Sequence, residues 1–409
     1  MPDSPQATVP WAEQKATASD GTPLAWLGSW VAISGSTAFV SARNATVDGQ
    51  PSQGAVYVFE RSAGSWHQRQ KLVGKESAAG DQFGAAVALH GNIALIAAPN
   101  ATIDGHLWQG AVHVFVHSPT ARGWTETQRL VASDGARLAT FGTAVAFHGE
   151  YAFVGAGGAN THGEFLPRKV YVFRRTSRTG DHWVQTQILD NPDPADVTSS
   201  FGAALAASAD FLLVGARSAT LQGNIGQGIV YVYRLKDGAW SLDGKISDPH
   251  GAARDNFGCS IALQDHVALI GAQGAAVDGN QGAVYHYAFK GAGWQFVRKL
   301  TPTHPMRPAL FGASVSVSGD SALVGAYAEK QYQGAAYLFK LKSGTYVQQQ
   351  RLTAGDGVAN DVFGYYGALD GATAVVGAYT KKVGGNVQQG AVYFYVGPSI
   401  GPALGVAEA

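Results

Sequence analysis

The stretch FGAAVALHGNIALIAAP at residues 83–99, followed by QGAVHVF at residues 109–115, decides the fold. It contains a run of small residues, a tight polar turn at His90-Gly91-Asn92, and an apolar run that ends in small residues. A loop and a third run ending in an aromatic residue follow. The runs are short and their apolar character is alternating or continuous, which favours half-buried and buried β-strands. The stretch therefore predicts three strands, the first two joined by a tight turn and the last two by a longer loop.

The Phe-Gly pair that begins this stretch returns along the chain at intervals of 52 to 60 residues. Leu27-Gly28 stands 56 residues before the first pair and occupies the same place in its unit. Each unit adds a fourth run that begins with an aromatic residue, such as Trp66 to Leu72. Because repeated four-stranded antiparallel units are typical of propellers, the seven units predict an all-β, seven-bladed β-propeller. The Phe-Gly pairs are Phe83-Gly84, Phe141-Gly142, Phe201-Gly202, Phe257-Gly258, Phe311-Gly312 and Phe363-Gly364.

The two ends of the chain predict that the ring closes. The seventh unit ends at Tyr395, after its third strand, while a run of the fourth-strand type lies at Trp11 to Ala16. We expect this N-terminal strand to complete the last blade, because pairing removes an open sheet edge. The predicted domain is one propeller over residues 9–396, with tails at 1–8 and 397–409. Its blades are expected to start near residues 27, 83, 141, 201, 257, 311 and 363.

These motifs resemble the FG-GAP repeat, the unit of the integrin α-subunit propeller and of many bacterial surface and secreted proteins. The resemblance covers almost the whole chain and implies a propeller used for adhesion or ligand binding, often outside the cell. Integrin-type repeats often carry a calcium loop of the form Asp-x-Asp-x-Asp-Gly between the first two strands. Here the corresponding turns, such as Asp370-Gly371, offer at most one carboxylate, too few for a calcium cage. We therefore expect no cofactor, with calcium as the ion that the resemblance alone would imply.

The composition limits the kinds of molecule that the protein is expected to bind. Charged residues are 14% of the chain, with 29 Lys and Arg against 29 Asp and Glu, so we expect no nucleic-acid partner. No apolar run is long enough for a bilayer, so we expect no membrane insertion, and we expect a monomer. Residues Met1 to Pro5 have neither the basic nor the apolar region of a secretory signal. Two explanations stay open: the protein has no such signal, or one precedes the printed sequence.

Loop lengths indicate which face carries function. The links from second to third strand and from blade to blade are long, and in a propeller both emerge on one face. Function concentrates on loops held by a rigid scaffold, so we expect a carbohydrate or protein ligand to bind this long-loop face, with the axial depression as its pocket. Three Trp residues, at 26, 30 and 108, lie off the repeated Trp position. The candidate ligand-binding residues are Trp26, Trp108, His106, Asp104, Phe165 and Tyr332.

Each candidate has a structural alternative. Trp26 and Trp108 could fill gaps between irregular loops, and Asp104-Gly105 is a common turn former. A Gln-Gly pair precedes most third strands, as at Gln53, but Pro167-Arg168 replaces it in the third unit. These Gln side chains could close the long loops by hydrogen bonds, or they could form a polar ring on the binding face.

The sequence contains no nucleophile elbow, phosphate-binding loop or zinc-ligand spacing. We therefore interpret the chain as a non-catalytic binding scaffold, with Cys259 as a small buried residue. A polysaccharide lyase or hydrolase is the alternative, because an axial site assembled from single residues of several blades leaves no linear motif. A secreted toxin or host-interaction component is a third possibility. The candidate catalytic residues for the enzyme are His106, His162, Arg254 and Tyr332.

Overall fold

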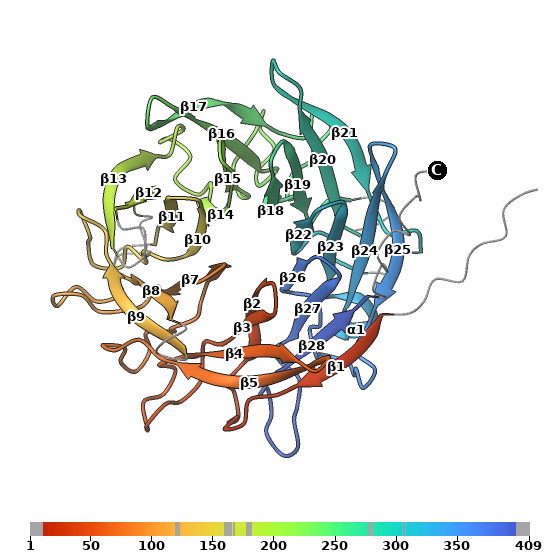
Figure 1. Ribbon diagram of the computed structural model, residues 1–409. Coiled ribbons are helices and arrows are strands. Elements are labelled where there is room, and N and C mark those ends of the chain that lie inside the picture. Colours follow the sequence, from red (N-terminus) through yellow and green to blue (C-terminus); the bar gives the residue numbers. More distant parts are fainter. Residues whose placement is uncertain are drawn as a thin grey trace, which may run out of the picture.

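In the computed structural model, seven four-stranded antiparallel sheets surround a central axis (Figure 1). The structure describes residues 11–118, 123–158, 166, 168–176, 182–276, 281–304, 306 and 308–397. In six sheets the strands follow one another in sequence order across the sheet. The first strands of neighbouring blades contact each other all the way round, from β2 through β6 and the others to β26 and back to β2. The predicted seven-bladed propeller is confirmed.

The strands take four positions from the axis outward. The first strands are β2 (Leu27–Ser34), β6 (Val87–His90), β10 (Ala144–His148), β14 (Phe201–Ala207), β18 (Phe257–Gln264), β22 (Val315–Ser318) and β26 (Gly367–Asp370). The second strands are β3 (Thr37–Ala42), β7 (Ile93–Ala98), β11 (Tyr151–Ala156), β15 (Phe211–Ala216), β19 (Val267–Ala272), β23 (Ser321–Ala326) and β27 (Thr373–Ala378).

The third strands are β4 (Ala55–Ser62), β8 (Ala111–Ser118), β12 (Lys169–Arg175), β16 (Ile229–Lys236), β20 (Ala283–Phe289), β24 (Ala335–Lys342) and β28 (Ala391–Val396). The fourth strands are β5 (Ser65–Leu72), β9 (Gly123–Leu130), β13 (Trp183–Asp190), β17 (Ala239–Ile246), β21 (Trp294–Leu300), β25 (Thr345–Leu352) and β1 (Ala12–Ala16). We number the blades 1 to 7 in the order of their first strands. The helix α1 (Glu329–Tyr332) is a single turn in a blade 6 loop, and no described helix is long and apolar enough to cross a bilayer.

The N-terminal strand closes the ring, as predicted. Strand β1 pairs antiparallel with β28, with Glu13 opposite Tyr395. The Tyr395 hydroxyl donates a hydrogen bond of 3.1 Å to the Glu13 carboxylate, and Lys15 forms an ion pair with Asp356 of blade 6 at 2.6 Å. The predicted tails lie outside the described residues except for Gly397.

The Phe-Gly motif holds one blade against the next. The Phe83 N–H donates to the Gln53 carbonyl of blade 1 at 2.9 Å, and Gly84 has a φ of +95°, which favours glycine. A Cβ on Gly54 would lie 2.2 Å from the Phe83 carbonyl oxygen, so this glycine makes room for the neighbouring blade. The Gln53 side chain is buried, and its Nε2 donates to the Ser77 carbonyl at 2.7 Å. The repeated Gln therefore closes loops, as the structural alternative predicts.

The repeated Trp residues join the outer edges of the blades. Gln70 in β5 accepts a hydrogen bond from the Trp124 N–H and donates one to the Trp124 carbonyl, both at 2.8 Å. The same paired bonds join Gln14 to Trp66 in the next blade. The Trp66 ring also stacks on Phe394 at a centroid distance of 4.6 Å. The fourth-strand Trp residues are thus structural.

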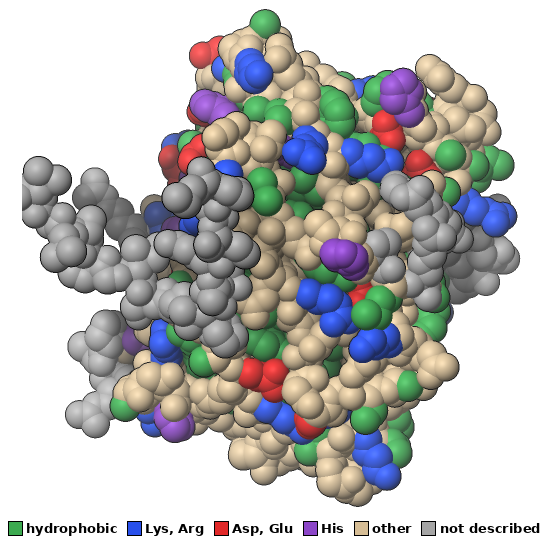
Figure 2. All heavy atoms as spheres, turned by 90° about the vertical axis from the view of Figure 1, so that its right-hand side faces the viewer, with side chains coloured by type: hydrophobic (Ala, Val, Ile, Leu, Met, Phe, Trp, Pro, Cys, Tyr) green, Lys and Arg blue, Asp and Glu red, His purple; other side chains and the backbone are tan. Residues whose placement is uncertain are grey.

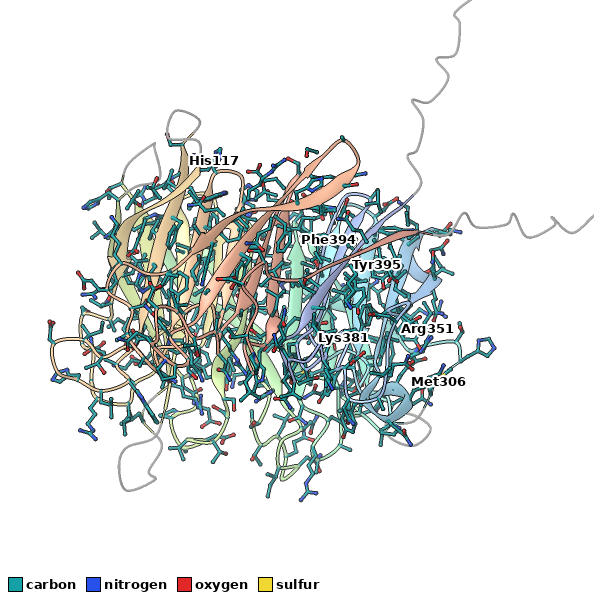
Figure 3. The ribbon with its side chains drawn as sticks, turned by 90° about the horizontal axis from the view of Figure 1, so that it is seen from below. His117, Met306, Arg351, Lys381, Phe394 and Tyr395 are labelled. Atoms are coloured by element: carbon teal, nitrogen blue, oxygen red, sulfur yellow. The ribbon has the colours of Figure 1, made fainter. Side chains whose placement is uncertain are left out.

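Both classes of long loop lie on one face, as predicted. The Leu24 N–H, in a loop between blades, donates to the Val387 carbonyl in a loop between second and third strands at 2.9 Å. In Figure 3, His117 lies toward one side of the disc, while Met306 and Lys381, from long loops, lie toward the other. On the outer side seen in Figure 2, Lys and Arg are interspersed with Asp and Glu.

Candidate functional site

A cavity of about 610 Å³ follows the propeller axis. The first strands of blades 1, 3, 4, 5, 6 and 7 line it, and the ends of nearby strands on the long-loop face supply its remaining residues. Its volume lies within the range of roughly 300–1,000 Å³ that is usual for small-ligand sites. The predicted axial pocket is therefore present.

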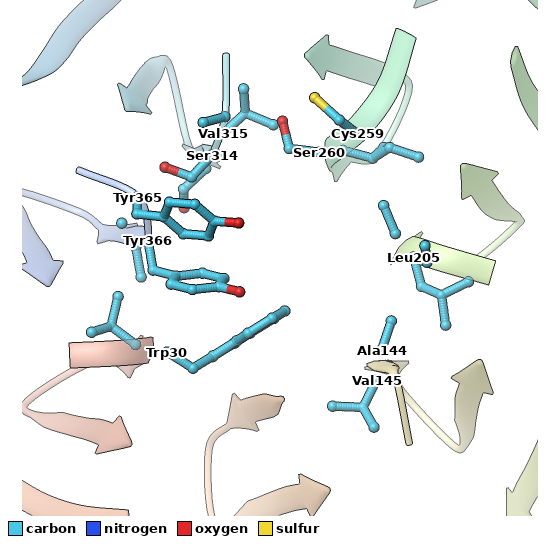
Figure 4. A pocket seen from close by; sticks show the side chains of 18 of the residues that line it. Trp30, Ala144, Val145, Leu205, Cys259, Ser260, Ser314, Val315, Tyr365 and Tyr366 are labelled. Carbon is cyan, nitrogen blue, oxygen red and sulfur yellow. The ribbon is translucent and has the colours of Figure 1, made fainter. Parts of the chain in front are cut away.

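Aromatic rings form one wall of this cavity (Figure 4). Trp30 extends from β2, and its ring lies 4.7 Å from that of Tyr366. The Trp30 Nε1–H donates to the Val87 carbonyl of blade 2 at 2.9 Å, which fixes the indole across that blade. Tyr365 lies 4.8 Å from Tyr366, and both phenolic groups point into the cavity (Figure 4). Neither hydroxyl bonds to a described residue, so both are available to a ligand.

The aromatic wall continues to the long-loop rim. Tyr327 and Tyr379 each pack on Tyr365, at centroid distances of 4.6 and 5.6 Å. Tyr379 contacts Trp26 at 5.8 Å, and Tyr327 contacts Tyr332 at 6.2 Å. Two of the residues predicted from the sequence, Trp26 and Tyr332, therefore join this aromatic surface from its outer ends.

The side of the cavity away from the tyrosines carries positive charge. Arg168 precedes β12, and Arg217 and Gln273 directly follow β15 and β19. All three therefore lie at strand ends on the long-loop face. Among the described lining residues, the charged ones are Arg168 and Arg217, and none is acidic. Burial lowers the pKa of Arg168, and the nearby Arg217 charge lowers it further.

Cys259 lies on the cavity wall, which corrects the prediction of a small buried residue. It is half-buried, and its Sγ lies 3.5 Å from the Gly312 carbonyl, to which the thiol donates. Burial raises the pKa of this thiol, so the neutral form predominates near pH 7.

The other predicted ligand-binding residues lie away from the cavity. Asp104 and His106 belong to a tight turn in which Ile103 and His106 exchange backbone hydrogen bonds, and His106 Nδ1 lies 3.0 Å from Gln109 Oε1. Trp108 is 46% exposed on the blade 2 rim. Phe165 lies outside the described residues.

The described candidate catalytic residues do not meet around the axis. None of His106, Arg254 and Tyr332 lines the axial cavity, and His162 lies outside the described residues. Among the described residues, no group of three or more His, Cys, Asp and Glu side chains is placed to hold a metal ion.

Sequence reasoning missed most of the cavity because its residues occupy positions where the repeats differ. The second residue after the Phe-Gly pair is small in most units but is Trp30 in blade 1 and Tyr366 in blade 7. Arg217 and Tyr379 share the position that follows the second strand, where blade 2 has Pro99. Aligning the units and selecting the most variable axial positions would have found these residues.

Among solved structures, the chain resembles Saccharomyces cerevisiae Sqt1 with a TM-score of 0.48 and 10% identity, over 96% of this chain and 99% of that one. It resembles the Pseudomonas aeruginosa periplasmic gluconolactonase PpgL with a TM-score of 0.51 and 16% identity, over 81% of this chain and 86% of that one. At these identities, the likenesses concern the fold alone. No curated protein sequence matches the chain.

A family model described as the FG-GAP repeat matches six segments, at residues 11–59, 66–115, 124–173, 240–287, 294–339 and 346–395. Each segment begins in the fourth strand of one blade and ends in the third strand of the next. The matched repeat thus crosses the boundary between blades. The first match accordingly begins at the closing strand β1, which belongs to blade 7, and ends in blade 1. The chain belongs to the FG-GAP repeat family.

Proposed function

We propose that this propeller is a non-catalytic binding protein that takes a saccharide into the axial cavity from the long-loop face. The observation that carries the proposal is the wall of Trp30, Tyr365 and Tyr366. Their rings offer broad apolar surface, and the two phenols face the cavity with hydroxyls that bond to no described residue. A sugar ring presents the matching combination of a C–H face and hydroxyl groups.

The size of the cavity favours a saccharide over a protein partner. A stable protein interface buries about 800 Å² on each partner and needs a broad surface, whereas the axial site is a cavity of about 610 Å³ between the inner strands. A protein ligand would instead rest on the exposed apolar rim, where Trp108 is 46% and Ile225 is 70% exposed. The two kinds of ligand therefore depend on different residues.

A glycan array followed by calorimetric titration tests the proposal. Ala313 lines the cavity at the position that Tyr365 occupies in blade 7, so Ala313→Tyr is expected to fill space without breaking the fold. We expect this variant to weaken saccharide binding at least tenfold, and Trp108→Ala on the rim to leave it unchanged.

Two results would contradict the proposal. If no saccharide binds, or if Trp108→Ala abolishes binding while Ala313→Tyr does not, the axial cavity is not the saccharide site. Cleavage of the bound polysaccharide in a parallel assay would contradict the non-catalytic part and favour the lyase or hydrolase.

A further inference from the structure

Arg217 presents an uncompensated charge at the cavity mouth. The side chain is exposed, lines the cavity, and neither bonds to nor forms an ion pair with any described residue. Some other arginines of this protein form ion pairs with carboxylates, as Arg351 does with Glu329 at 2.6 Å and Arg174 does with Glu150 at 2.7 Å. The Arg217 guanidinium therefore keeps its donors for a group outside the described chain.

Arg168 brings a second guanidinium to the same cavity through a departure from the repeat. It stands where the other units have the glycine of Gln-Gly, for example Gly228 in blade 4. Its Nη1 donates to the Gly157 carbonyl at 3.3 Å, and a Cβ on Gly157 would lie 2.6 Å from Arg168 Cγ. Glycine at residue 157 thus makes room for the arginine stem, and the bond to its carbonyl orients the guanidinium.

The positive charges of the two arginines repel each other at the cavity. Burial lowers the pKa of Arg168, and the positive charge of Arg217 lowers it further. No acidic residue is among the described residues that line the cavity. A bound anion would relieve this repulsion, and the partly enclosed site would strengthen its attraction to both side chains.

We propose that the cavity selects a saccharide that carries a carboxylate, with the carboxylate held by Arg217 and Arg168 and the sugar ring against Trp30 and Tyr366. This inference rests on the proposed function. The planar guanidinium fork matches a carboxylate in two parallel hydrogen bonds. Gln273 and the Tyr365 hydroxyl, both on the cavity wall, are available for the sugar hydroxyls.

The charge selection is local. The chain has 29 basic and 29 acidic residues, so no strong overall field concentrates polyanions at its surface. An acidic saccharide is therefore recognised by one carboxylate that lies in the cavity, and a neutral saccharide of the same shape lacks only that contact.

Titration with matched probes tests the inference. Trigalacturonate is compared with its fully methyl-esterified form, and sialyllactose with its methyl ester, so that the two arms distinguish a uronate from a sialate. We expect one acidic probe to bind at least tenfold more tightly than its neutral counterpart, and its affinity to fall as salt is raised. Arg217→Ala is expected to lower the affinity for the acidic probe to that for the neutral probe. Arg217→Lys is expected to keep part of the difference in affinity between the two probes.

Arg61→Ala is the matched control, because Arg61 is an exposed arginine near the end of β4 that lies away from the long-loop face. The variant removes the same charge and is expected to leave the affinity for both probes unchanged. Equal binding of an acidic probe and its neutral counterpart, with both lost in Ala313→Tyr, would overturn the carboxylate inference and leave the proposed function standing. Failure of all four probes, together with a blank glycan array, would overturn both.

Discussion

At the scale of residues, aspartates in the loops between blades tie those loops to the next blade. Asp356 accepts a hydrogen bond of 2.5 Å from the Tyr393 hydroxyl and forms an ion pair with Lys15. Asp20 has the same two kinds of partner, Tyr57 at 2.7 Å and Lys71 at 2.7 Å. Each of these carboxylates is thus held by a tyrosine of the third strand and a lysine, although it is still half-exposed.

This arrangement predicts an acid-sensitive contribution to stability. Burial alone would raise the pKa of Asp356, but hydrogen bonds from Lys15 and Tyr393 outweigh it and lower the pKa from 3.8 to about 2. A lowered pKa in the folded state means that the stabilisation is complete above the unfolded value and is lost as the pH falls through the folded one. We expect Asp356→Asn to cost about 1 kcal/mol at pH 7, because the carboxylate is half-exposed.

Thermal unfolding between pH 8 and pH 2.5 checks this prediction. The difference between wild type and Asp356→Asn should be constant down to about pH 5 and shrink below about pH 4. Asp237→Asn is the control, since Asp237 is exposed in a tight turn and is expected to cost little at any pH. A difference that persists unchanged to pH 2.5 would show that the ion pair and hydrogen bond are not its source.

At the scale of elements, neighbouring blades are joined where the chain enters the first and third strands. Gly110 precedes β8 with a φ of +90°, and a Cβ there would lie 2.2 Å from the Phe141 carbonyl oxygen of blade 3. Gly105 has a similar φ of +82°, but a Cβ there would meet nothing within 4 Å. This pair separates the cost of backbone conformation from the cost of separating two blades.

We expect Gly105→Ala to cost about 1 kcal/mol, the usual penalty of a left-handed backbone. Gly110→Ala should cost roughly 2 kcal/mol more, because the blade 3 backbone must move. Chemical denaturation of the two variants measures the difference. Equal costs would mean that contact between the blades at this glycine contributes nothing to stability.

At the scale of the whole molecule, closure of the ring depends on the five-residue strand β1 near the N-terminus. Removing residues 1–16 deletes β1 and its pairing with β28, leaving the last blade with an open edge. We expect the melting temperature to fall by on the order of 10 °C, with aggregation through the exposed edge. A peptide of residues 11–18 should restore part of the loss, and a scrambled peptide should not. An unchanged melting temperature would contradict closure by this strand.

The architecture was predictable from the sequence because each blade repeats the same short sequence motifs. Phe-Gly, Gln-Gly and the fourth-strand Trp are visible in single units, and the missing last strand at Tyr395 could be matched to Trp11. The site was only partly predictable. Trp30, Tyr366, Arg168 and Arg217 are far apart in the chain, and only the closed ring brings them around one cavity. Trp26 could be selected as a candidate because Trp residues off the repeated position are visible in the sequence.

The central claim is that the ligand occupies the axial cavity, and Cys259 reports on it directly. It is the single cysteine of the chain and lines the cavity. Alkylation by iodoacetamide, followed by mass spectrometry, therefore measures the accessibility of this one site. The raised pKa of its thiol predicts slow labelling at pH 8 in the folded protein and fast labelling after denaturation. A saturating saccharide should slow the labelling of the folded protein at least tenfold, and an unchanged rate with saccharide bound would show that the ligand binds outside the axial cavity.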